Sequence, residues 1–190
     1  MQPEEFVLNP PGAGSGGVSR AGAWFDAMFQ EHYPRIVSIL ARLTGDRGQA
    51  EEIGADVFHK LARRPAPADG RDDLTAWVYR VATNAGFDAL RTNSRRRRRE
   101  EAAGAESLRA AAPASALDGM LRQERCARVR TVLAALKPRD SQLLLLRADG
   151  LAYRELARTL GIQPGSVGTL LARAEAQFER KFRLRYGDEV

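Results

Sequence analysis

The stretch GLAYRELARTLGIQPGSVGTLLARAEAQFER, residues 150–180, constrains the fold more than any other part of the sequence. A short run with apolar residues at helical spacing ends at Gly161, and a longer run begins after Pro164. Glycine permits a sharp turn, and proline suits the first position of a helix, where no amide donor is needed. The stretch therefore predicts two helices joined by a tight turn.

Such a pair of helices has two interpretations. It can be a plain helical hairpin that only builds a core, or a helix-turn-helix motif that places its second helix in a DNA groove. In the second case the residues that would meet base edges are Gln163, Ser166, Thr169 and, further along the helix, Arg173. The spacing alone leaves both interpretations open.

The distribution of charge favours the DNA interpretation. Residues 91–99 carry six arginines and no acidic residue, and residues 120–190 carry 14 basic and 8 acidic residues. Residues 1–90 and 100–119 are each acidic overall, so the net charge of +6 is concentrated in two separate segments. Two basic segments in one chain indicate a polyanionic partner.

The rest of the chain predicts an all-α fold. Strand-like alternation is lacking, and apolar residues recur at helical spacing before residue 92 and again after residue 120. We therefore expect two small helical domains joined by a flexible linker, the second containing the helix-turn-helix. The expected boundaries are a disordered tail at 1–21, a first domain at 22–99, a linker at 100–119 and a second domain at 120–190.

Composition argues against several classes of protein. One cysteine, Cys126, and two histidines, His32 and His59, predict neither a disulfide nor a zinc site, and we expect Cys126 to be a small core residue. Because the phosphate-binding and dinucleotide-binding motifs of enzymes are lacking, we expect no enzyme, no cofactor and no metal. The sequence shows no apolar leader and no stretch that could span a membrane, which fits a cytoplasmic protein without membrane contact.

Three stretches resemble one protein family, the bacterial sigma factors of the extracytoplasmic-function type. LKPRDSQLLLLRADGLAYRELARTLGIQPGSVGTLLARAEAQF is similar to the module that reads the −35 element of promoters. AEEIGADVFHKLAR resembles the segment that docks on RNA polymerase, and TAWVYRVATNAGFDALRTNSRRRRR resembles the segment that melts and reads the −10 element. The resemblance covers about residues 24–99 and 120–182. It implies a sigma factor whose partners are core RNA polymerase, promoter DNA and, in some members, an anti-sigma factor.

The helix predicted from about residue 74 to about residue 91, together with the arginines that follow it, combines aromatic and basic residues in the way that single-stranded DNA binding requires. Trp77 and Tyr79 can stack on exposed bases, although Trp77 also falls on the apolar stripe and suits the core equally well. Asn84 and Asp88 lie one turn apart and share a face. The candidate −10 residues are Trp77, Tyr79, Arg80, Asn84, Asp88, Arg91, Arg95, Arg96, Arg97, Arg98 and Arg99, and we expect the last five to follow phosphates.

A helix predicted at roughly residues 47–63 carries the candidate docking residues. Glu51, Glu52 and Asp56, with Phe58 nearby, form an acidic and partly apolar face that suits a basic coiled coil on the polymerase. An ordinary solvated face is the alternative interpretation. The chain also departs from the family: it has Gly54 and Ala55 where larger residues are usual, and Gly168, Leu170 and Glu175 where basic residues are usual.

Two other classes of protein share a helix-turn-helix. A site-specific recombinase needs an additional catalytic fold, often rich in strands, and residues 1–119 show none. A transcriptional regulator that is not a polymerase subunit would bind duplex DNA by itself, whereas a sigma factor depends on core polymerase. Binding of core polymerase therefore separates the last two classes.

The arginine distribution predicts how the two DNA-binding parts share the ionic attraction. Each phosphate neutralised lowers log K by about 0.9 per tenfold rise in salt on duplex DNA. Changing Arg95–Arg99 to alanine should therefore flatten the salt slope of holoenzyme binding by several units, and Arg173→Ala by about one at most. Binding isotherms at several salt concentrations measure both slopes, and a larger effect of Arg173 would reverse the two assignments.

Overall fold

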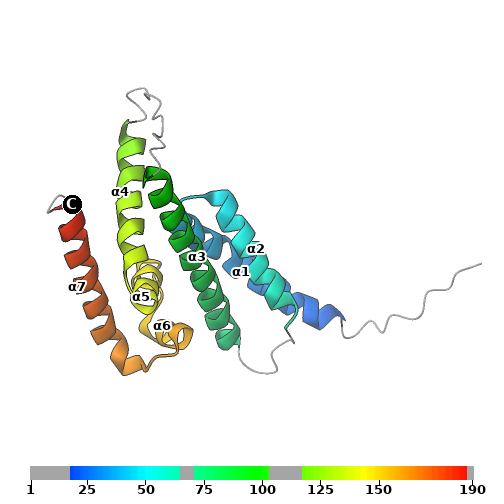
Figure 1. Ribbon diagram of the computed structural model, residues 1–190. Coiled ribbons are helices and arrows are strands. Elements are labelled where there is room, and N and C mark those ends of the chain that lie inside the picture. Colours follow the sequence, from blue (N-terminus) through cyan, green and yellow to red (C-terminus); the bar gives the residue numbers. More distant parts are fainter. Residues whose placement is uncertain (1–17, 65–70, 103–116, 188–190) are drawn as a thin grey trace, which may run out of the picture.

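The computed structural model of the chain is all-helical over the residues that it describes, 18–64, 71–102 and 117–187 (Figure 1). This part of the chain contains no strand. The elements, in chain order, are α1 (Val18–Thr44), α2 (Arg47–Ala62), α3 (Arg71–Ala102), α4 (Leu117–Ala135), α5 (Pro138–Ala148), α6 (Tyr153–Leu160), the 3₁₀ helix η2 (Pro164–Ser166) and α7 (Val167–Tyr186). The expected all-α fold is confirmed. Most of the expected tail and linker lies outside the described residues.

Helices α1, α2 and α3 form the first module, and the turn between α1 and α2 follows from three adjacent residues. Thr44 Oγ1 donates a hydrogen bond to the Leu40 carbonyl, and Gly45 takes a φ of 78°, which favours glycine. Asp46 then caps α2, because its side chain accepts a hydrogen bond from the Gln49 amide at 3.1 Å. The turn brings the apolar faces of the two helices together.

Helices α4 to α7 form the second module, which contains the predicted helix-turn-helix. Gly161 ends α6 with a φ of 63°, and Pro164 begins η2, which leads into α7. The start of α6 is fixed by Glu155, whose carboxylate accepts a hydrogen bond from the Ala152 amide at 2.6 Å. Leu156 of α6 and Val167 of α7 are both fully buried, so the two helices share a core.

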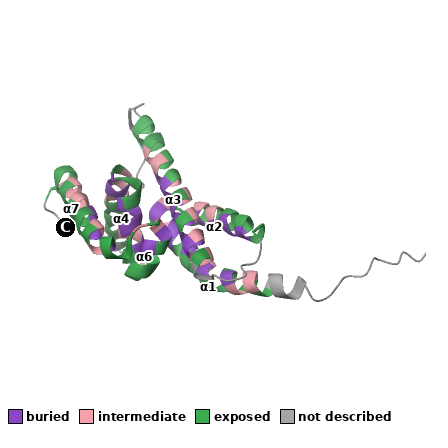
Figure 2. Cartoon of the chain, turned by 90° about the horizontal axis from the view of Figure 1, so that it is seen from below, coloured by how far each residue is buried: buried purple, intermediate pink, exposed green. Residues whose placement is uncertain are grey.

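The two modules pack against each other rather than lying apart. One cluster of buried residues combines Val78 and Tyr79 of α3 with Leu146 of α5 and Leu156 of α6. A second cluster joins residues of α1 and α3 to residues of α4 and the turn that follows it: Leu43, Phe87, Leu90, Leu133 and Leu136. Figure 2 shows buried residues gathered where α3 meets the second module. Helix α3 is therefore covered from two sides.

The tight packing of α1 on α3 predicts opposite outcomes for one substitution at two glycines. A Cβ at Gly86 would lie 2.7 Å from a methyl of Leu40 and 2.8 Å from one of Leu43, and both leucines are buried. Overpacking costs about 1–3 kcal/mol, which exceeds the gain of up to about 1 kcal/mol from replacing a helical glycine by alanine. Thermal melting followed by circular dichroism should show a lower Tm for Gly86→Ala.

Gly119→Ala is the matched control, because nothing lies within 4 Å of the added Cβ on α4. It should leave Tm unchanged or slightly raised. If Gly86→Ala melts at or above the temperature of Gly119→Ala, the described packing of α1 on α3 is wrong.

Candidate nucleic-acid interface

A stripe of polar residues runs along one face of α3. Arg80, Asn84 and Asp88 recur every four residues and are all exposed; we call these three residues the reading stripe. One turn further, Arg91 forms an ion pair with Asp88 at 3.6 Å. The Asn84 side chain is also engaged by the second module, since its Oδ1 accepts a hydrogen bond from Gln142 Nε2. The stripe therefore combines an amide that can read a base with charges that can meet a backbone.

Trp77 fits both roles that the sequence left open, packing in the core and stacking on an exposed base. Its ring is half-buried and packs against the core cluster of the first module. The Arg64 guanidinium lies 4.2 Å from the ring centroid, a cation–π geometry. Trp77 thus contributes to packing while keeping part of its ring accessible.

Tyr79 does not stack on bases in this arrangement, contrary to the prediction from sequence. Its side chain is only 3% exposed. Burial raises the pKa of its phenol to about 12, although the positive charge of Arg35 opposes the shift. The prediction failed because α3 has a second buried face that helical periodicity within the first module does not reveal.

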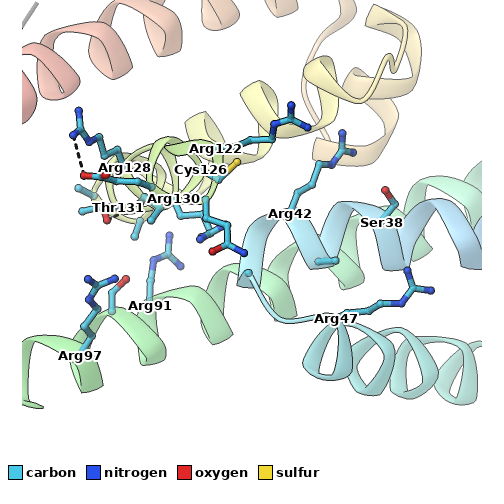
Figure 3. Close-up of a pocket in the computed structure, with 18 of the residues that line it drawn as sticks. Ser38, Arg42, Arg47, Arg91, Arg97, Arg122, Cys126, Arg128, Arg130 and Thr131 are labelled. Carbon is cyan, nitrogen blue, oxygen red and sulfur yellow. Dashed lines mark hydrogen bonds and ion pairs between the residues drawn. The ribbon is translucent and has the colours of Figure 1, made fainter. Parts of the chain in front are cut away.

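A groove of about 1970 Å³ lies between the modules, and ten of the residues that line it are arginines. Figure 3 shows Arg91 and Arg97 of α3 extending toward the helix that carries Arg128 and Arg130. The arginines that line this arginine groove are Arg42, Arg47, Arg91, Arg95, Arg97, Arg98, Arg122, Arg128, Arg130 and Arg185. Two carboxylates line it among the described residues, and both are paired, Glu51 with Arg47 at 2.8 Å and Glu124 with Arg128 at 3.0 Å. The groove is therefore strongly positive and suits an anionic polymer.

The run of five arginines divides between two surroundings. Arg95, Arg97 and Arg98 line the arginine groove. Arg96 instead pairs with Glu100 at 2.7 Å, and this hydrogen bond raises the pKa of Arg96. Arg99 donates a hydrogen bond to the Arg95 carbonyl at 3.3 Å. Sequence reasoning missed the groove arginines outside α3, because only the folded chain brings them beside the run.

The candidate docking residues of α2 do not behave alike. Glu51, Glu52 and Asp56 are exposed, as docking requires. Phe58 is only 2% exposed, so the prediction that it offers an apolar docking contact is wrong. Its ring meets the edges of Phe29 and Tyr33, with centroids 5.2 and 5.5 Å apart. The low exposure of Phe58 and its aromatic contacts place it in the core.

The structure explains why position 54 is occupied by a glycine. A Cβ there would lie 3.0 Å from Val37 and 3.3 Å from the Tyr33 ring. The close approach of α1 to α2 therefore leaves little room for the larger residue that is usual in the family. Phe29, stacked on Tyr33 at 4.5 Å and 38% exposed, is the aromatic residue of this cluster that stays accessible.

The candidate −35 residues lie together at the start of α7. Gln163 precedes η2, Ser166 ends it, and Thr169 and Arg173 follow on α7; all four are exposed. Leu171 of α7 is buried, and it faces the core while these polar side chains face outward. The arrangement matches the second helix of a helix-turn-helix that is free to enter a groove.

Other sites are not found in the described part of the chain. It contains no group of three or more histidine, cysteine or acidic residues placed to hold a metal ion. Cys126 is exposed on the wall of the arginine groove, so the expectation that it is a core residue is wrong. Within the described residues, no helix combines the length and apolar character needed to cross a membrane.

These features define a two-module helical protein with an arginine-rich helix in one module and a helix-turn-helix in the other. Residues 28–96 match the family model of Sigma-70 region 2, and residues 126–178 match that of Sigma-70 region 4. The chain belongs to the extracytoplasmic-function group of the sigma-70 family and is a sigma factor of RNA polymerase.

Named relatives agree with this assignment. The chain is 25% identical over 183 residues to the ECF RNA polymerase sigma factor SigE of Mycolicibacterium smegmatis, covering 93% of this chain and 67% of that protein. It is 28% identical over 147 residues to the RNA polymerase sigma factor CarQ of Myxococcus xanthus, covering 75% and 79%. A solved structure, the sigma factor RpoE of Bartonella quintana in complex with the anti-sigma factor NepR, aligns with a TM-score of 0.46 at 18% identity, covering 82% of this chain and 94% of that one.

The different burial of Asp56 and Phe58 predicts how two variants will differ. Phe58→Ala should destabilise the protein by about 3–5 kcal/mol because it leaves a cavity in the core. Asp56→Lys should leave Tm unchanged and weaken binding to core polymerase, since Asp56 is exposed. Thermal melting and a holoenzyme pull-down measure the two effects. A normal Tm for Phe58→Ala would contradict its burial, and unchanged holoenzyme formation for Asp56→Lys would remove α2 from the docking surface.

Proposed function

We propose that the first module, within residues 22–99, docks on core polymerase and reads the −10 element, while residues 120–190 read the −35 element. Residues 100–119 connect the two parts. The observation that carries this proposal is the reading stripe on α3, which continues directly into the arginines of the groove. One helix can therefore hold a base at one end and the backbone of the same strand at the other.

Asn84 is the residue that we assign to base recognition. Its amide offers both a donor and an acceptor, which can pair with the edge of an unstacked base. Arg80 precedes it by one turn, and Arg91 and Arg95 follow it, so phosphates on either side of that base would meet positive charge. The half-buried ring of Trp77 provides a further surface for stacking.

Docking on the polymerase is assigned to the exposed acidic residues of α2. Glu51, Glu52 and Asp56 are all exposed, although Glu51 also lines the arginine groove and pairs with Arg47. A basic helical surface on the polymerase would complement them. Phe29, exposed beside Phe58, replaces Phe58 as the candidate apolar contact.

The second module is assigned to the −35 element with a small ionic contribution. Gln163, Ser166 and Thr169 can form hydrogen bonds with base edges, and Arg173 can meet a phosphate. Gly168, Leu170 and Glu175 supply no positive charge. Most of the ionic attraction therefore comes from α3.

The chain acts as a regulatory subunit and not as a catalyst in its own right. Its work is to place the polymerase, whose own active site synthesises RNA. This role locates it in the cytoplasm with the polymerase and the chromosome. A regulator that works without polymerase is disfavoured by the match to both sigma regions in one chain.

Run-off transcription with purified core polymerase on genomic fragments tests the proposal. The protein should select a small set of promoters and should not bind duplex DNA tightly by itself. On a selected promoter, Asn84→Ala should reduce opening at the −10 element, seen by permanganate footprinting. Loss of one bidentate base contact costs about 1–3 kcal/mol, so we expect a reduction of at least about fivefold.

Asn93→Ala is the matched control on the same helix. The Asn93 side chain donates a hydrogen bond to Gln49 Oε1 at 3.0 Å and so turns toward α2. It should leave promoter opening unchanged. Equal defects in the two variants would remove the base-reading role from Asn84, and a protein that selects no promoter with core polymerase would remove the proposed function.

A further inference from the structure

The second module packs against α3 directly beside the reading stripe. Tyr79, Ala82 and Val78 of α3 belong to one buried cluster with Leu143 and Leu146 of α5. Thr83, which adjoins the reading stripe, is fully buried. In this arrangement a DNA strand cannot reach the part of α3 that these contacts cover.

One polar contact of the interface involves the base-reading residue itself. Gln142 of α5 is 7% exposed, and its Nε2 donates hydrogen bonds to Asn84 Oδ1 and, at 3.4 Å, to Thr83 Oγ1. An amide NH₂ group has the same donor character as the amino groups of adenine and cytosine. Gln142 therefore occupies the acceptor of Asn84 in the way that a base would.

A second polar contact fastens the modules on the neighbouring side. The Asp149 carboxylate, 9% exposed, follows α5 and accepts hydrogen bonds from Arg35 Nε at 2.6 Å and from Arg42 Nη2. Arg35 Nη2 also donates to the Asp149 carbonyl at 2.7 Å. Burial is the largest single influence on the pKa of Arg35 and lowers it, but the hydrogen bond to Asp149 and the electrostatic interactions with Tyr79, Asp149 and Glu155 together outweigh burial, so the pKa is raised. One carboxylate thus joins two arginines of α1 to the second module.

We propose that these contacts form a latch, Asn84–Gln142 and Asp149–Arg35–Arg42, by which the second module inhibits −10 reading in the free protein. The latch rests on the proposed role of Asn84. Its polar members regain water or DNA partners when the modules separate. Opening the interface therefore exposes polar as well as apolar surface. When only the open form binds a ligand, the apparent affinity equals the intrinsic affinity multiplied by the fraction of molecules that are open. Promoter DNA must therefore compete with the latch.

The test compares the full-length chain with the double variant Gln142→Ala, Asp149→Ala. Small-angle X-ray scattering of the free protein should give a larger radius of gyration for the variant, because its modules separate. A single-stranded oligonucleotide that carries the −10 sequence of a selected promoter should bind the variant several-fold more tightly in a fluorescence titration. Arg35→Gln, which changes the latch from the α1 side, should expand the free protein in the same way.

Glu179→Ala is the control, because Glu179 pairs with Arg183 within α7 at 2.8 Å and does not join the modules. It should leave both measurements unchanged, and circular dichroism verifies that every variant remains helical. If the double variant and Arg35→Gln stay as compact as the parent, the latch is wrong. Expansion without tighter binding of the −10 oligonucleotide would overturn its inhibitory role. Neither result affects the proposed function, which is judged by transcription with the unaltered protein.

Discussion

The burial of α3 from two sides is the constraint on which the rest of the structure depends. Its first face packs on α1 and α2 and completes the first module, while its second face meets α5 and α6. The exposed reading stripe lies between these buried faces. A single helix therefore sets the stability of one module, the position of the other and the orientation of the residues that we assign to DNA.

Local signals in the sequence predicted the secondary structure well. Gly161, which has a positive φ, ends α6 where the sequence indicated a turn, and Pro164 begins the helical segment that follows. These signals act over a few residues, so they can be read without knowledge of the tertiary fold. The helix-turn-helix and the exposure of its candidate −35 residues followed from the same reasoning.

Assignments that depended on distant contacts were less successful. Tyr79 and Phe58 are aromatic residues beside polar ones, and nothing local distinguishes a buried ring from an exposed one. Both became core residues because helices from elsewhere in the chain cover them. Cys126 shows the opposite error, since α4 leaves it on a groove wall. In the arginine run, adjacent residues point about 100° apart around the helix, which is why only some of them face the groove.

The arginine groove sets like charges opposite one another. Its walls come from different modules, so closing the chain brings cationic surfaces together across a wide cavity. That arrangement stores electrostatic repulsion, which the Asp149 pairs and the shared apolar core must overcome. Dissolved salt screens the repulsion and the attractive pairs alike, whereas a polyanion in the groove would remove the repulsion alone. The balance between the closed and open chain is therefore sensitive to which anions surround the protein, and not only to how many.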